Sequence, residues 1–171
     1  MKTIKTKLFG EAEYTKDDGV DFDDKTISLN NKKSTCTVMI FEGLNETELD
    51  KGIKLLDILE ELDALARKEI IALNEDSNSI VSEFANDHFN EYGEDIQNTI
   101  FEKLNINSQD NKAFLENMEI GLVVVYEDAS KGVCATIDYN LIWEDGDAFT
   151  DQVLAISFNE NSQLISIAYE S

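Results

Sequence analysis

Hydrophobic and polar residues alternate along the first forty residues of the chain, and a period of two is typical of β-strands. In the run TCTVMIF, Cys36, Val38 and Ile40 share one face, and the residues between them share the other. The alternation is interrupted by KDDG and NNKK, whose composition is typical of turns. We predict strands at residues 3–9, 20–22, 26–29 and 35–41.

In the middle of the chain the period of the apolar residues changes to that of a helix. Asn45 can cap a first turn, with Glu48 bonding back to the cap, and Leu44 can pack against Leu49. Apolar residues then recur at steps of three or four as far as Leu73, which predicts one long amphipathic helix, with or without a kink. Three shorter helices are predicted at residues 79–93, 94–104 and 109–118.

A period of two returns in the last third of the chain and defines the fold class. Strands are predicted at residues 120–127, 132–143, 151–158 and 163–170. This order indicates an α+β fold, in which a mainly antiparallel sheet of N-terminal and C-terminal meanders carries the central helical segment on one face. The second face is expected to be solvated, because one predicted strand has a polar side formed by Cys134, Thr136, Asp138 and Asn140.

The chain shows no sign of a boundary between domains. It has no proline, no glycine-rich linker and no internal repeat, so we expect a single α+β domain over residues 1–171. The first residues lack the apolar run of a signal peptide, and no later run is long enough to cross a membrane. We therefore expect a cytoplasmic protein.

The charge of the chain is strongly one-sided, with 36 acidic residues against 14 lysines and arginines and a net charge of −22. Such a charge repels phosphate backbones and anionic lipids over roughly 8 Å at physiological salt, so neither nucleic acid nor membrane is an expected partner. A basic protein is the partner that the charge favours. The alternative is that the excess of acids serves only to keep the protein dispersed.

Few residues of the chain suit catalysis. The single histidine, His88, lies on an apolar stripe, where a structural role is the simpler interpretation. Cys36 and Cys134 lie in predicted strands without metal-site spacing or an electropositive setting that would activate a thiol. The eight glycines are scattered singly, so no phosphate-binding loop is predicted. We expect no enzyme activity, no catalytic residue and no cofactor.

Two acidic clusters are the candidates for a functional surface. The candidate partner-binding residues are Asp17, Asp18, Asp21, Asp23 and Asp24 in the first cluster, and Glu144, Asp145 and Asp147 in the second. Neither cluster has the ligand spacing of an EF-hand. A calcium or magnesium site without a known motif is the alternative to partner binding, because carboxylates are ligands of both ions. The simpler interpretation of the first cluster is a solvated turn between edge strands, where charges deter unwanted strand pairing.

The C-terminal run TDQVLAISFNENSQLISIAYES, preceded by IDYNL, resembles the closing segment of the bacterial family called domain of unknown function 2004. The opening MKTIKTKLFG and the helical run LLDILEELDALARKEI are similar to that family as well. The resemblance extends over nearly the whole chain. It implies a single α+β domain and no catalytic residue, and neither acidic cluster matches a motif of the family.

The net charge, the small size and the missing catalytic residues favour a non-enzymatic module that binds and neutralises a basic partner protein, as bacterial immunity proteins neutralise toxins. One alternative is a metal-dependent hydrolase that uses the surface carboxylates. Another is a structural or oligomerising subunit, because the oligomeric state is not fixed by the sequence.

Overall fold

The computed structural model describes residues 1–90, 93–142 and 148–171, with the exception of the Asp24 side chain. The N-terminal strands are β1 (Lys2–Thr6), β2 (Gly10–Tyr14), β3 (Val20–Leu29) and β4 (Lys32–Ile40). The helices are α1 (Glu46–Asp57), α2 (Leu59–Leu73), α3 (Ile80–Asn90), α4 (Glu94–Leu104) and α5 (Asn111–Asn117). The C-terminal strands are β5 (Glu119–Asp128), β6 (Gly132–Asn140), β7 (Val153–Asn159) and β8 (Leu164–Glu170).

Six strands form one sheet in the order β3-β4-β5-β6-β7-β8, and β1 and β2 form a separate hairpin. Every neighbouring pair in the large sheet is antiparallel except β4 and β5, which run parallel. The parallel pair lies where the two meanders meet, because all the described helices lie between β4 and β5 in the chain and return it to the same end of the sheet. The predicted α+β fold with a mainly antiparallel sheet is confirmed.

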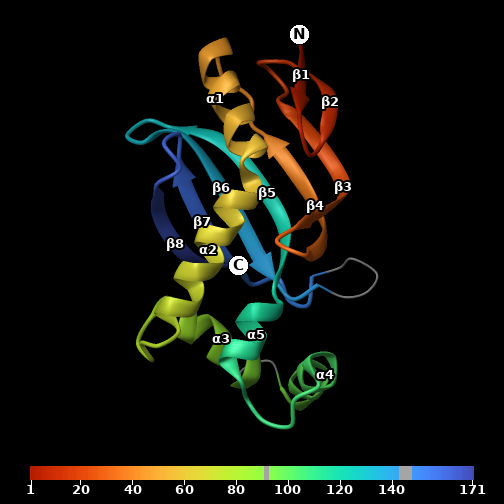
Figure 1. Ribbon diagram of the computed structural model, residues 1–171, viewed down its shortest axis with the longest axis vertical. Helices are drawn as coiled ribbons and strands as arrows, with labels where there is room; N and C mark the ends of the chain where they lie inside the picture. The colour runs from red at the N-terminus through yellow and green to blue at the C-terminus, as the bar shows by residue number, and fades with distance from the viewer. Residues whose placement is uncertain (91–92, 143–147) are drawn as a thin grey trace.

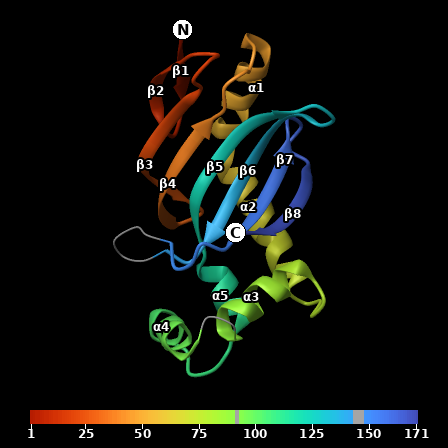
Figure 2. The same ribbon diagram turned by 180° about the vertical axis from the view of Figure 1, so that it is seen from behind.

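Helices α1 and α2 lie across one face of the sheet, and α3, α4 and α5 gather at one end of it (Figure 1). Helix α1 contacts β5 and β6 on this covered face, as well as β1 of the hairpin. Gly52 allows the close approach, since a Cβ atom at this position would come within 2.5 Å of the Val125 Cγ1 atom. None of the described helices lies over the opposite face, which we call the open face (Figure 2).

The predicted start of the first helix is confirmed in detail. The Asn45 side chain accepts hydrogen bonds from the backbone N–H groups of Thr47 and Glu48, and the Glu48 carboxylate accepts one from the Asn45 N–H at 2.7 Å. The long helix, however, is two helices that meet at Ile58, whose backbone leaves the helical conformation at φ −111° and ψ 19°. Buried residues from the hairpin, the helices and the sheet form one core cluster, from Ile4 to Phe158.

The N-terminal strands differ from the prediction in two places. The run GEAEY, which was not among the predicted strands, is β2 and pairs with β1. The runs predicted as two short strands at 20–22 and 26–29 are one strand, β3, with a bulge between Phe22 and Lys25. The bulge moves the alternation by one residue, so Phe22, Ile27 and Leu29 are all buried despite their odd spacing.

Candidate functional site

The structure places the first acidic cluster at one edge of the sheet. Asp17 and Asp18 lie in the turn between β2 and β3, where the Thr15 hydroxyl donates to Asp18 Oδ2 at 2.7 Å. Asp21 and Asp23 lie on β3, the edge strand, so a turn is the correct description for only part of the cluster. These four aspartates are exposed, and none of them forms an ion pair with a described residue.

The structure does not describe the side chains of the remaining candidate acids. The Asp24 side chain and the whole second cluster, Glu144, Asp145 and Asp147, lie outside the described residues. Among the residues that are described, no group of three or more histidine, cysteine, aspartate or glutamate side chains is arranged to hold a metal ion.

The two cysteines and the histidine are buried. Burial raises the pKa of the Cys36 thiol to about 12, and burial followed by the charge of Asp128 raises the pKa of Cys134. Burial also lowers the pKa of His88, whose Nδ1 lies 2.8 Å from the Phe84 carbonyl oxygen and whose Nε2 lies 2.9 Å from the Thr150 hydroxyl. The neutral ring therefore donates from Nδ1 and accepts at Nε2, and it ties α3 to the segment before β7.

A buried polar cluster around Asp63 was not anticipated from the sequence. Its carboxylate accepts hydrogen bonds from Arg67 Nε at 2.9 Å, from the Tyr139 hydroxyl at 2.8 Å and from Asn30 Nδ2 at 2.8 Å. Arg67 also donates to the Met118 carbonyl oxygen at 3.0 Å and lies 5.1 Å from the centre of the Tyr139 ring. The signal in the sequence was an i,i+4 pair of opposite charge on the apolar side of the helix.

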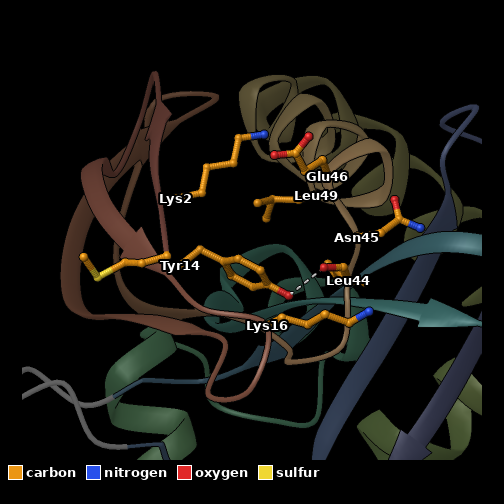
Figure 3. Close-up of a pocket in the computed structure, with 8 residues that line it drawn as sticks. Lys2, Tyr14, Lys16, Leu44, Asn45, Glu46 and Leu49 are labelled. Carbon is orange, nitrogen blue, oxygen red and sulfur yellow. Dashed lines mark hydrogen bonds between the residues drawn. The ribbon is translucent and has the colours of Figure 1, made fainter.

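A pocket of about 310 Å³ lies between the N-terminal hairpin and the start of α1 (Figure 3). It is lined by Met1, Lys2, Tyr14, Lys16, Leu44, Asn45, Glu46 and Leu49. Most of its polar groups already have structural partners. The Tyr14 hydroxyl donates to the Leu44 carbonyl oxygen at 3.3 Å, Lys2 pairs with Asp50 at 2.9 Å, and Asn45 caps the helix. The arrangement holds the hairpin against α1 and leaves few groups to orient a ligand.

The open face combines half-buried apolar residues with polar ones. Strand register defines one row across the face as Asp21, Met39, Val124, Thr136, Ser157 and Ser166. The next row is Thr37, Leu122, Asp138, Ala155 and Ala168. In the first row the Thr136 and Ser157 hydroxyls are 2.7 Å apart and satisfy one another. Met39, Leu122 and Val124 are half-buried, so an apolar strip runs along the centre of the open face.

Asp138 lies in the interior of the open face, on β6, which has three strands on one side and two on the other. Its side chain is half-buried and makes no hydrogen bond or ion pair with any residue that the structure describes. Burial, and to a smaller extent the charge of Glu170 on the same face, raises the pKa of Asp138 to about 6. The predicted polar side of this strand is thus only partly solvated, because Cys134 and Asn140 are buried.

Comparison with known proteins finds no matching protein family, no matching curated protein and no matching solved structure. The resemblance to domain of unknown function 2004 therefore stays a prediction. None of the helices in the described part of the chain is long and apolar enough to span a membrane.

Proposed function

We propose that this chain is a non-enzymatic binding module that recognises and neutralises a basic partner protein. The observation that carries the proposal is the uncompensated negative charge: 36 acidic residues stand against 14 basic ones, and the described aspartates at the β3 edge are exposed without ion pairs. An unpaired acidic surface attracts a cationic protein and repels an anionic one.

The chemistry of the candidate nucleophiles supports a non-enzymatic role. With pKa values raised by burial, Cys36 and Cys134 are thiols and not thiolates at neutral pH. His88 uses both ring nitrogens in hydrogen bonds that hold α3 in place. A complex with a basic protein requires none of these groups, since its association rate comes from charge and its lifetime from a few well-packed contacts.

The proposal is tested by affinity capture from the lysate of the native host, followed by titration of the purified captured protein. We expect a basic protein whose association slows as salt is raised. A variant with Asp17, Asp18, Asp21 and Asp23 changed to asparagine should associate more slowly than the wild-type chain. The matched control changes Glu61, Glu69, Glu75 and Glu83, four exposed acids of the helical segment, to glutamine.

Both variants change the net charge by the same amount, so a difference between them reports the position of the charges and not their number. If no protein is retained at low salt, or if the retained protein is acidic, or if its binding is insensitive to ionic strength, the proposed function is wrong.

A further inference from the structure

We infer that the basic partner docks on the open face of the sheet, with Asp138 receiving a lysine or arginine side chain of that partner. The inference rests on the proposed function and assigns it a surface. It is carried by the composition of the open face, by the position of Asp138 on it and by the charge around it.

The open face has the composition of a protein-binding surface. Its centre is the apolar strip of Met39, Leu122 and Val124, which the fold leaves half in water. Its two ends are acidic, because Asp21 lies on one edge strand and Glu170 on the other, and register places both side chains on this face. An apolar centre inside a charged rim is the usual anatomy of a specific interface.

Asp138 is a charged group of the open face for which the described residues provide no partner. A carboxylate between Leu122 and Ala155 loses water on folding, and no described residue replaces that water with a hydrogen bond or a positive charge. The raised pKa of Asp138 has the same cause. A cation from outside the chain would supply the missing interaction, and it would approach from the side that no described helix covers (Figure 2).

Charge selects a basic protein over a second copy of the chain. Two copies would bring −22 against −22, with Asp138 facing an identical surface that offers acids at both edges. A basic protein brings the opposite charge to the same rim, and its lysine or arginine side chains have apolar stems that suit the strip beside Asp138.

The test measures binding to two probes: the basic protein captured by the wild-type chain, and a synthetic peptide of alternating lysine and leucine. The variants are Asp138→Asn, which keeps the shape and removes the charge, and Leu122→Ser, which breaks the apolar strip. The matched controls lie on α2: Glu61→Gln removes one exposed charge, and Leu65→Ser removes an exposed leucine with 48% of its surface accessible. Thermal unfolding of each variant verifies that it is folded.

We expect Asp138→Asn to weaken binding of the captured protein by about tenfold or more, as truncation of one partner of a desolvated charge pair does. Leu122→Ser should weaken it as well, and the two α2 controls should leave it within about twofold. On binding of the peptide, amide shifts should change on β4, β5 and β6 and not on α2.

Several results would overturn the inference. If a basic protein binds with unchanged affinity to Asp138→Asn and Leu122→Ser, the proposed function stands and the open face is the wrong surface. If the amide shifts cluster on the helices, the result is the same. If the chain forms a dimer that Leu122→Ser breaks, a second copy and not a basic partner occupies the face. If neither probe binds at low salt, the proposed function and the inference fail together.

Discussion

Asp63 and Asp138 both lose contact with water on folding, but they lie on opposite sides of the sheet. Among the described residues, only Asp63 has partners for its charge. Asp63 is fully buried under the covered face and accepts hydrogen bonds from Arg67, Tyr139 and Asn30. Asp138 lies on the open face and has no such partner among the described residues. The two sites lie on opposite sides of β6. Tyr139, which donates to Asp63, points into the core, and the residue before it, Asp138, points away from the core.

The difference separates a carboxylate that stabilises the fold from one that the described residues leave without a partner. A buried carboxylate costs free energy unless hydrogen bonds and a positive charge replace its water. The covered face supplies these groups from α2 and from the turn between β3 and β4, which fixes the helix on the sheet. The open face supplies none from the described residues, so under the proposed function the free energy that Asp138 costs would be recovered in the complex with the basic partner.

The largest expected effect is the loss of the Asp63 carboxylate. Asp63→Ala should lower the free energy of unfolding by about 3–5 kcal/mol, because it leaves the largely buried Arg67 guanidinium and the buried Tyr139 hydroxyl without their partner. Urea unfolding measures the change. As the control, Asp57→Ala removes an acid of α1 whose carboxylate, among the described residues, accepts only from the exposed Lys7 N–H at 2.8 Å. Equal losses for the two variants would contradict the structural role of Asp63.

Asp138→Asn should have the opposite sign. Because the folded-state pKa is about 6 and the unfolded value is lower, the folded chain binds the proton more tightly, and Asp138 destabilises the fold as the pH rises from about 4 to above 6. The asparagine variant should gain about 1–3 kcal/mol at neutral pH and lose this gain as the pH falls to about 4. Unfolding curves over this pH range measure it, and a gain that does not vary with pH would contradict the argument.

Two adjacent valines on β5 compare the faces without any charge. Val123 is fully buried on the covered face, and Val124 is half-buried on the open face. Val123→Ala should cost about 2 kcal/mol through lost burial and the cavity left behind, and Val124→Ala less than about 1 kcal/mol. Similar costs for the two variants would mean that the open face is packed against something in the folded chain.

The smallest effect on stability is expected at the β3 edge. Asp21→Asn with Asp23→Asn should leave the melting temperature unchanged, because both side chains are exposed and unpaired among the described residues. The same variant should reduce the salt dependence of association with the basic partner, as loss of rim charges does. Stopped-flow association over a salt series measures it, and an unchanged salt dependence would remove these two acids from the encounter surface.

The sequence predicted the parts of the fold that local signals specify. The Asn45 cap, the C-terminal strands and the α+β class follow from capping residues and periodicity, which act within a few residues. The β3 bulge was missed because it adds one residue to the alternation, and β2 because Glu11 and Glu13 give it little strand propensity. The parallel pairing of β4 with β5 joins residues far apart in the chain and has no local signal.

Only the acidic character of the candidate site could be predicted from the sequence. The sequence identified the exposed aspartates of the β3 edge, and it placed Asp138 on a polar strand side. The only local difference between Asp138 and Asp63 in the sequence is that Asp63 has an arginine, Arg67, four residues later, and this spacing alone does not show which of the two carboxylates is buried with partners. The distinction depends on which groups the tertiary fold brings to each carboxylate: Arg67 and Tyr139 to one, and only open surface among the described residues to the other.

The most direct measurement is an NMR titration of the Asp138 carboxyl in the free chain and in its complex with the basic partner. The free chain should titrate with a pKa of about 6, and the complex with a pKa lower by about one unit or more, because a lysine or arginine beside the carboxylate favours its charged form. By linkage, one unit corresponds to about tenfold tighter binding of the ionised form. A free carboxyl that titrates like an ordinary exposed aspartate, or a pKa that is unchanged or higher in the complex, would contradict the account.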